Sequence, residues 1–565
     1  MFNNALIYNA LLYFRLKYAY SNLQSLLGYV FMKNLILALT TGLLLALAWP
    51  TYGFPLLLFC CFVPLLWVTH KSILKPVKKS GLKLFGLAYL AFFIFNIITT
   101  WWLYNSTGFG MWFAVLANSL LMTFVWMFYR RASKRLSVNL SLVFLISLWM
   151  LFEFMHLNWE FSWPWLNLGN GFATYTGWIQ WYEFTGTFGG TLWVWVVNAL
   201  IFKGVLAFAE TKNQRTLFIK LAFAAGVILI PIGASQLIYH NYTETQDPVE
   251  VVLLQPNIDP YTEKYNTTNE RIADLLFEEA SKSLTDSTDF LIAPETVLAE
   301  GAGVDIRNFE YSAEKEKAKD FLNTYPDLNY LAGIQFYRLY TNEEDIISTT
   351  NYVGKDRIGN PIWADFFNSA FLLNQSDTSQ IYHKSKLVVG VENFPYQSIL
   401  KPLLGDVMID LGGTVSMKTT QKNRVAFTGT DETKVAPIIC YESVYGDFVT
   451  DYVKAGAEFL AIITNDAWWG DTQGHKQHLN YARLRAIENR RSIARSANTG
   501  ISAIINQKGE IEKELGYGLR GTLKGNVNKN KKLTFYSKHG DYLAKLAFVP
   551  AIGLLIFLFF RRKKP

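Results

Sequence analysis

The sequence predicts a multi-pass α-helical membrane domain joined to an α/β domain that lies outside the cytoplasm. The chain has 565 residues, of which 51% are hydrophobic and only 17% are charged. This composition is too apolar for a soluble protein and too charged for a purely intramembrane one. Long apolar runs are confined to the part before residue 243 and to the C-terminal end, whereas short apolar runs alternate with helical patterns over 243–540. Lys and Arg gather in loops on one side of the predicted spans.

The membrane domain is predicted over 32–242, with about seven transmembrane helices. Residues 1–31 are expected to form an interfacial helix or to belong to an over-extended start, because Met32 begins a more natural N-terminus. The first span has no small-residue cleavage site, which indicates a retained anchor. Residues 541–565 are predicted to hold one further transmembrane helix and a basic cytoplasmic tail. The predicted spans lie near residues 34–49, 53–68, 84–100, 111–129, 140–157, 191–208, 217–239 and 543–560.

The loops between these spans predict the orientation of the chain. The basic stretches "HKSILKPVKKSGLK", "RRASKR", "ETKNQR" and "RRKKP" follow the second, fourth, sixth and eighth spans. The intervening loops carry almost no Lys or Arg. Because loops rich in Lys and Arg stay in the cytoplasm, residues 243–540 are predicted to lie on the opposite side of the membrane.

The segment 243–540 has the pattern of an α/β domain. The runs "VEVVLLQPNI", "FLIAPET", "YLAGIQFY", "SAFLLNQ", "VAPIICYES" and "FLAIITNDAW" are mostly strand-like. Helical patterns such as "NERIADLLFEEASKSL" and "HLNYARLRAIENRR" lie between them. Strands that alternate with helices predict a buried sheet covered by helices.

Reactive side chains follow three of these strand or loop ends. Glu295 lies in "FLIAPETV", Lys384 in "IYHKSKLVVGVEN", and Cys440 ends the apolar run "APIIC". A thiol accepts an acyl group as the thiolate, so it needs a base. A glutamate can take the thiol proton, and a lysine can stabilise the oxyanion of a tetrahedral intermediate.

Each of the three residues also has a purely structural interpretation, and spacing alone leaves both interpretations open. A lone cysteine after an apolar run is often a small buried hydrophobe. The glutamate could be a charge at a helix N-terminus, and the lysine could be a solvated residue at a strand edge.

The motifs around these residues resemble a known group of enzymes. "APET", "YHKSKLV…VE", "PIICYES" and "TNDAWWGDT…QHLNYARLRAIENRRSIARSANTGIS" occur in the order typical of the nitrilase superfamily, over most of residues 249–507. A nitrilase domain with seven spans before it and one after it is similar to one family in particular, apolipoprotein N-acyltransferase. The resemblance implies an αββα sandwich over 243–540 and a catalytic Glu-Lys-Cys triad.

The resemblance also implies a reaction and roles for single residues. An acyl chain would pass from a phospholipid to Cys440, and the thioester would then acylate the N-terminal amine of a diacylglyceryl-cysteine lipoprotein. Glu295 would be the general base and Lys384 the oxyanion stabiliser. The positions that match active-site support in the family are Glu392, Tyr441 and Glu442. The implied location is the bacterial inner membrane with the α/β domain in the periplasm, and no cofactor is implied.

The chain departs from the family pattern at two places. After the lysine the family commonly has "LVPFGE", whereas this chain has "LVVGVE". The family usually has a Lys-Trp pair near the mouth of the site, where "EKYN" offers Lys264 and Tyr265. An aromatic residue is kept, so altered substrate fit is expected, with the chemistry retained.

Other features of the sequence have plainer interpretations than a functional site. The helical spacing of His475 and His478 is not expected to mark a metal site, because no third ligand accompanies them. The arginines of "ARLRAIENRR" are expected on a charge-paired, solvated helix face. The tryptophan-rich loop at 158–170 suits either an interfacial anchor or lipid access. Glu153 is the clearest charge inside a span.

Composition and cysteine usage limit the remaining functions. The net charge of +8 is concentrated in loops beside the spans, so nucleic-acid binding is not expected. The cysteines Cys60, Cys61 and Cys440 offer no disulfide framework. Two alternatives stay open, a membrane-tethered nitrilase-type amidase and a non-catalytic lipid-binding or transport protein. We expect a monomer, because nothing in the sequence requires more.

Overall fold

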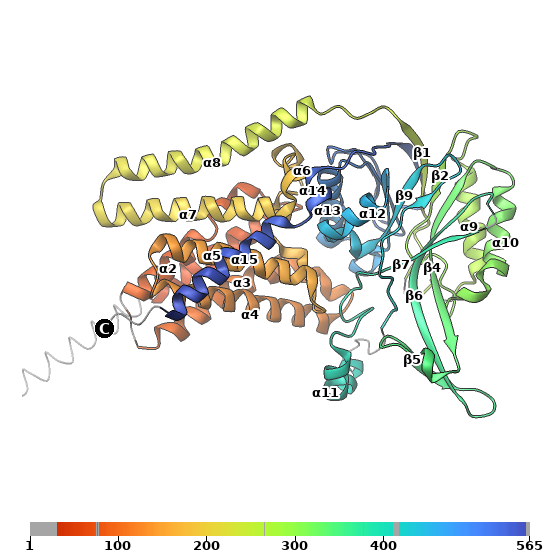
Figure 1. Cartoon of the computed structure of the whole chain (residues 1–565), viewed down its shortest axis with the longest axis horizontal. Helices are drawn as coiled ribbons and strands as arrows, with labels where there is room; N and C mark the ends of the chain where they lie inside the picture. Colours follow the sequence, from red (N-terminus) through yellow and green to blue (C-terminus); the bar gives the residue numbers. More distant parts are fainter. Residues whose placement is uncertain are drawn as a thin grey trace, which may run out of the picture.

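The computed structural model describes residues 31–560, except 75, 77, 261, 265, 377 and 411–416. The prediction for residues 1–31 therefore lies outside the described residues, apart from Phe31. The predicted fold class is confirmed, because a bundle of apolar helices is joined to an α/β domain with two sheets (Figure 1).

The apolar helices of the described part agree with the spans predicted from the sequence. Seven are long and apolar enough to cross a membrane, and a shorter one covers Phe31–Leu47. They are built from η1 (Pro55–Phe59), α2 (Val63–Leu74), α3 (Ser80–Thr100), η2 (Trp101–Asn105), α4 (Gly108–Ser133), α5 (Val138–Asn158), α7 (Thr187–Thr211), α8 (Gln214–Asn241) and α15 (Tyr542–Phe560). Polar caps fix several starts, since Thr107, Ser137 and Asn213 each accept a backbone N–H of the first turn.

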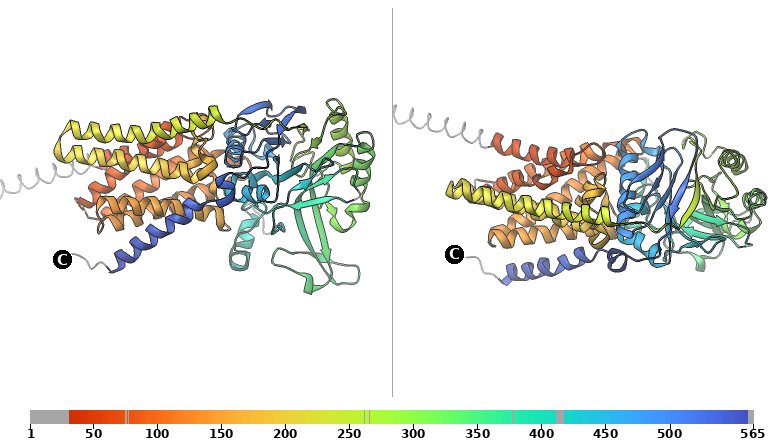
Figure 2. Two further views of the ribbon diagram at one scale, coloured as in Figure 1. Left: turned by 45° about the horizontal axis from the view of Figure 1, so that its top comes forward. Right: turned by 90° about the horizontal axis from the view of Figure 1, so that it is seen from above.

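The basic loops gather at the end of the bundle that is far from the α/β domain. Arg130 Nη2 donates to Ser80 Oγ at 2.9 Å, which joins the end of α4 to the start of α3. Arg135, between α4 and α5, donates to the carbonyl of Leu558 near the end of α15 at 3.2 Å. The turn between α7 and α8 and the end of α15 also lie at this end (Figures 1 and 2).

The α/β domain contains a larger and a smaller sheet. The larger sheet is formed by β1 (Pro248–Gln255), β2 (Phe290–Ile292), β3 (Val304–Asp305), β4 (Asn329–Tyr340), β5 (Asn351–Lys355), β6 (Pro361–Leu373), β7 (Gln380–His383) and β14 (Gly521–Asn528). Its main order is β14-β1-β2-β4-β6-β5, with β3 beside β4 and β7 beside β6.

The smaller sheet is formed by β8 (Phe427–Thr428), β9 (Lys434–Ile439), β10 (Phe459–Thr464), β11 (Ile493–Ala497), β12 (Ser502–Ile505) and β13 (Ile511–Leu515). Its order is β13-β12-β11-β10-β9-β8. The pairs β9–β10 and β10–β11 are parallel, so β9 and β10 end at the same edge. The longer helices of the domain are α9 (Asn269–Ser281), α10 (Ala313–Leu322), α11 (Gln397–Asp410), α12 (Gly446–Lys454) and α13 (Gln473–Asn489).

Strand alternation explains how the layers stack. Val251 and Leu253 of β1 pack between the two sheets, in one core with Ile438 of β9. Val252 and Leu254 point the other way and pack against α9 and α10. Helices therefore cover both outer faces of a pair of stacked sheets, with α9 and α10 on the far side and α12 and α13 next to the bundle (Figure 1).

Helix α13 is shared between the α/β domain and the membrane bundle. Leu479, Ala482 and Ala486 face the smaller sheet. Tyr481, Leu484 and Ile487 belong to the same buried cluster as the membrane helices. The joint between the two parts is therefore a continuous apolar core.

The expected solvated face of arginines on this helix is wrong. Arg485, Arg490 and Arg491 are at most 2% exposed. Arg485 pairs with Glu488 at 2.9 Å, and Arg490 pairs at 2.8 Å with Glu183 in α6 (Tyr182–Thr185). Arg485 and Arg490 are paired with carboxylates, whereas Arg491 donates to backbone carbonyls, and all three are buried.

Candidate active site

The three predicted reactive residues lie at strand ends that face the same region. Glu295 follows β2, Lys384 directly follows β7, and Cys440 directly follows β9 as the first residue of η8 (Cys440–Val444). β2 and β7 belong to the larger sheet and β9 to the smaller one. The site therefore lies where the ends of the two stacked sheets meet.

Glu295 and Lys384 form a buried ion pair. Lys384 Nζ lies 2.8 Å from Glu295 Oε1, and the lysine side chain is 1% exposed. Glu295 Oε2 accepts the backbone N–H of Asn465, which follows β10, at 3.1 Å. Hydrogen bonds from both sheets therefore fix the carboxylate in one orientation.

Glu392 lies on the other side of the lysine. Its Oε2 is 2.9 Å from Lys384 Nζ. Burial alone would lower the pKa of Lys384, but the two carboxylates outweigh it and hold this pKa well above the usual value. The lysine is therefore a fixed cation and not a base.

The departure "LVVGVE" preserves this contact. Gly390 has φ +79°, a left-handed conformation that suits glycine. The Val388 carbonyl accepts the N–H of Glu392 at 2.9 Å, and Glu392 Oε2 accepts the N–H of Val388 at the same distance. The shifted glycine closes a tight turn that brings Glu392 to Lys384.

Cys440 combines a strained backbone with a buried thiol. Its φ is +50°, which is uncommon for a residue with a side chain. Burial, and then the charge of Glu295, raise the pKa of the thiol well above its usual value, although Lys384 opposes this. The resting residue is therefore a thiol that needs a base before it can react.

Glu442 fastens the loops that carry the lysine and the cysteine. Its Oε1 accepts the N–H of Ser385 and the hydroxyl of Tyr382, both at 2.7 Å. Its Oε2 accepts the N–H of Ile439 and the hydroxyl of Tyr452, both at 2.9 Å. Ser385 and Ile439 are chain neighbours of Lys384 and Cys440, so this carboxylate fixes their spacing.

The neighbouring Tyr441 points toward the membrane domain. Its hydroxyl donates to the carbonyl of Ser162 at 3.2 Å, and its ring packs at right angles to that of Tyr445, 5.2 Å away. Tyr441 and Glu442 are thus adjacent in the chain but fasten the site to different parts of the molecule.

Lys264 supplies a second ammonium group near Glu295. Its side chain is buried and donates to the hydroxyl of Thr296. The aromatic ring beside it is that of Trp468, 5.9 Å from Nζ, whereas Tyr265 lies outside the described residues. Burial lowers the pKa of Lys264 to about 8, although Glu295 and Glu392 act in the opposite direction.

The tryptophan-rich loop 158–170 packs directly against the α/β domain. Trp165 is 1% exposed, and its Nε1 donates to Gln477 of α13 at 2.7 Å. Its carbonyl accepts the hydroxyl of Tyr481 at 2.8 Å. Glu153 accepts the N–H of Leu168 at 2.8 Å and thereby fixes this loop to α5. Trp165 is therefore part of the joint between the domains and not an interfacial anchor.

Three side chains near the thiol have the donor atoms of a metal site. The ligand atoms of Cys440, Asp466 and His478 lie within 4.8 Å of one another. The Asp466 carboxylate is already paired with Arg495 at 2.6 Å and with His478 Nδ1 at 3.0 Å. These bonds suit a buried charge network better than an open metal site.

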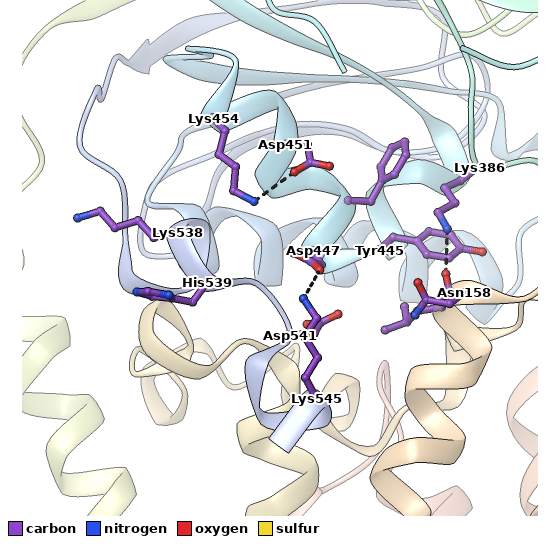
Figure 3. A pocket seen from close by; sticks show the side chains of 12 residues that line it. Asn158, Lys386, Tyr445, Asp447, Asp451, Lys454, Lys538, His539, Asp541 and Lys545 are labelled. Atoms are coloured by element: carbon purple, nitrogen blue, oxygen red, sulfur yellow. Dashed lines mark hydrogen bonds and ion pairs between the residues drawn. The ribbon is translucent and has the colours of Figure 1, made fainter. Parts of the chain in front are cut away.

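A polar pocket of about 390 Å³ lies at the level where α5 ends and α15 begins (Figure 3). Carboxylates and ammonium groups share its wall, and the pairs Lys454–Asp451 and Lys545–Asp447 lie within it. Such a lining does not suit an acyl chain. The pocket is lined by Leu157, Asn158, Lys386, Tyr445, Asp447, Phe448, Asp451, Lys454, Lys538, His539, Asp541 and Lys545.

Comparisons with known proteins agree with this architecture. The carbon-nitrogen hydrolase family matches residues 253–531, and the apolipoprotein N-acyltransferase N-terminal domain matches residues 41–200. The apolipoprotein N-acyltransferase of Chlorobaculum tepidum is 26% identical, over 90% of this chain and 93% of that protein. The apolipoprotein N-acyltransferase of Geobacter metallireducens is 25% identical, over 94% and 96%. A mutant of the Nesterenkonia AN1 amidase from the nitrilase superfamily has a TM-score of 0.35 and 12% identity, over 54% of this chain and 99% of that chain.

The stacked sheets and the matched region define a carbon-nitrogen hydrolase carried on a membrane bundle. Both the hydrolase region and the N-terminal helices have their counterparts in one group of proteins. The chain belongs to the apolipoprotein N-acyltransferase family. The resemblance predicted from the sequence motifs is confirmed.

Some members of the site carry little signal in the sequence. Asn368 in β6 donates at 2.8 Å to both Glu295 Oε1 and Glu392 Oε1, and so joins the two carboxylates. Asn465 holds the second oxygen of Glu295 through its backbone. The only available signal for Asn368 was a polar residue within the apolar run "FFNSAF".

Proposed function

We propose that this protein transfers an acyl chain from a phospholipid, through a thioester on Cys440, to the N-terminal amine of a diacylglyceryl-cysteine lipoprotein. The observation that carries the proposal is the buried Glu295–Lys384 pair, located at the same sheet edges as Cys440 and next to the membrane helices. The names of the relatives support the same activity.

In the first step, Glu295 takes the proton of the Cys440 thiol as the sulfur attacks the ester carbonyl of the phospholipid. The new C–S bond leaves a tetrahedral intermediate, whose oxyanion is stabilised by the Lys384 ammonium. The C–O ester bond then breaks, and Glu295 returns the proton to the leaving oxygen. The products are the thioester and a lysophospholipid.

In the second step, the lipoprotein amine attacks the thioester carbonyl. Glu295 takes a proton from the attacking nitrogen, and Lys384 again faces the oxyanion. The C–S bond breaks, the sulfur regains its proton from Glu295, and an amide is released. Glu392 keeps the lysine in place, while Tyr441 and Glu442 support the loops next to the cysteine.

We further propose that residues 243–540 form the catalytic domain in the periplasm and that residues 32–242 and 541–565 anchor it in the bacterial inner membrane. The basic loops at the far end of the bundle support this orientation. One chain supplies all the described side chains of the site, which fits a monomer.

The test is the intact mass of purified protein after incubation with phospholipid vesicles. We expect the wild type to gain the mass of one acyl chain, and hydroxylamine to remove it. Cys440→Ala should gain nothing. Turnover of a small amide without use of lipid would favour a membrane-tethered amidase. A folded wild type that does neither would indicate a lipid-binding protein.

A further inference from the structure

A buried group of polar side chains next to Cys440 has no part in the proposed proton transfers. It contains His478 and Asp466, both at most 1% exposed, together with Arg495. Asp466 Oδ1 lies 3.0 Å from His478 Nδ1, and Asp466 Oδ2 accepts from Arg495 Nη2 at 2.6 Å. The Nδ1 edge of the imidazole is therefore fixed by Asp466, whose carboxylate is itself paired with Arg495.

The other ring nitrogen of His478 faces the backbone of the cysteine. His478 Nε2 lies 3.2 Å from the Cys440 carbonyl oxygen and 3.0 Å from Ser443 Oγ. Ser443 Oγ donates its hydrogen to the same carbonyl at 2.7 Å. Because a carbonyl can only accept, and the serine hydrogen is already used, the tautomer that satisfies both contacts carries its proton on Nε2 and donates it to the Cys440 carbonyl.

The position of the ring is fixed from the membrane side as well. The centroid of His478 lies 5.9 Å from that of Trp165 in the loop 158–170 and 5.5 Å from that of Trp469. Trp469 in turn packs edge-on against Trp102 at 4.8 Å. The imidazole is therefore held between the membrane domain and the cysteine loop.

From this geometry we infer that His478 is a positioning residue, which holds Cys440 in its left-handed conformation by donating from Nε2 to the cysteine carbonyl. This inference rests on the proposed role of Cys440 as the nucleophile. The φ of +50° persists only where surrounding contacts enforce it. Without the donor the backbone relaxes, and the sulfur turns away from Glu295 and Lys384.

The test compares two substitutions that keep different halves of the imidazole. His478→Gln places an amide N–H near the position of Nε2 and keeps the donor to Cys440. In His478→Asn the amide lies near the position of Nδ1. It therefore faces Asp466 and cannot reach the Cys440 carbonyl. His475→Asn is the matched control, because His475 is equally buried on the same helix but bonds to Asp471 at 3.1 Å.

The first readout is the rate at which iodoacetamide alkylates Cys440 in the full-length protein, followed on the Cys440 peptide by mass spectrometry. We expect His478→Asn to react at least about tenfold more slowly than the wild type, since small displacements of a reacting group cost up to about 10²-fold. His478→Gln should stay within about threefold, and His475→Asn should react like the wild type.

Thermal melting of each variant separates positioning from loss of folding. If His478→Asn alkylates at the wild-type rate, or if the Gln and Asn variants of equal melting temperature are equally slow, the inference is wrong. Should His478→Asn not fold, His478→Gln carries the test alone, and a folded His478→Gln that reacts at least about tenfold more slowly than the wild type would overturn the inference. Alkylation needs no lipid, so a failed acyl transfer with the expected alkylation pattern would overturn only the proposed function.

Discussion

At the scale of single residues, Lys384 and Cys440 differ in protonation. The lysine keeps its charge, whereas the thiol must lose a proton before it can react. Two carboxylates hold the pKa of Lys384 well above its usual value despite burial. Burial and the neighbouring Glu295 raise the pKa of the Cys440 thiol. In the proposed mechanism a thiolate therefore forms only when Glu295 takes the proton, which would limit the reaction of an idle enzyme with other electrophiles.

Replacing the proposed base should slow the chemistry without unfolding the protein. We expect Glu295→Gln to lower the rate of thioester formation by about 10²–10⁴-fold, the usual contribution of a general base. The measurement is the time course of the acyl adduct by intact mass. Glu278→Gln is the control, because the Glu278 side chain is 78% exposed on α9. Equal rates for Glu295→Gln and the control would contradict the proposed role.

The ion pair between Glu392 and Lys384 should make stability depend on pH. Burial acts to raise the pKa of Glu392, but Lys384 and local hydrogen bonds hold it below the usual value. A carboxyl group with a depressed pKa stabilises the folded state above its unfolded value of about 4.3, and this stabilisation is lost as the pH falls through the folded pKa.

We therefore expect the melting temperature of the wild type to exceed that of Glu392→Gln at neutral pH. The difference should shrink as the pH is lowered below about 4.3, where Glu392 gains a proton first in the unfolded state, and it should be lost once the pH has fallen through the lower pKa of the folded state. Melting curves at a series of pH values measure it. A difference that stays constant down to acidic pH would show that the pair does not couple stability to protonation.

At the scale of the elements, one carboxylate fixes the spacing of two strands. Glu442 accepts the N–H groups that flank the ends of β7 and β9, and also the hydroxyl of Tyr452 in α12. Since β7 lies in the larger sheet and β9 in the smaller one, Glu442 fastens the two layers at the edge where the reactive residues lie.

Substitution of Glu442 should both destabilise the α/β domain and lower the rate at which Cys440 reacts. In Glu442→Gln the amide NH₂ faces a donor, which leaves a buried N–H or hydroxyl unpaired at a cost of about 1–3 kcal/mol. Tyr452→Phe removes only one of the partners and should cost less. Melting temperature and alkylation rate of Cys440 test both variants. If Tyr452→Phe proved the more damaging, the role of Glu442 in spacing the strands would be wrong.

The elements show which features the sequence could predict. The spans and the strands β1, β4, β6, β9 and β10 have strong apolar patterns, which predict them from the sequence. The strand β13 ("IEKEL") is polar and has no such pattern, because its stability comes from pairing with β12. Burial of the arginines in α13 and just after it cannot be predicted, since no local pattern shows that the membrane bundle covers the helix.

The residues of the site also divide into those that the sequence can predict and those that it cannot. Glu295, Lys384 and Cys440 could be singled out because each follows a short strand or belongs to a motif. Asn368 could not, because its contact with both carboxylates depends on how β4, β6 and β7 align. Likewise, the role of Trp165 depends on a bond to Gln477, more than three hundred positions further along the chain.

At the scale of the whole molecule, orientation in the membrane can be tested directly. In a background with Cys60, Cys61 and Cys440 replaced, Tyr311→Cys should react with a membrane-impermeant maleimide in intact spheroplasts, because Tyr311 is 93% exposed on the α/β domain. Lys212→Cys, in the exposed turn between α7 and α8, should react only after the membrane is opened. The reverse pattern would invert the proposed topology.

The shared helix α13 limits how this enzyme can be divided. A fragment that contains only the α/β domain would leave Tyr481, Leu484 and Ile487 without their membrane-domain neighbours. It would also leave Arg490 without Glu183, and it would lose the loop that holds His478 and Tyr441. Removing the membrane helices to obtain a water-soluble enzyme would therefore remove contacts that support the site itself. Inhibitor screening and directed evolution thus require the intact chain in detergent or lipid.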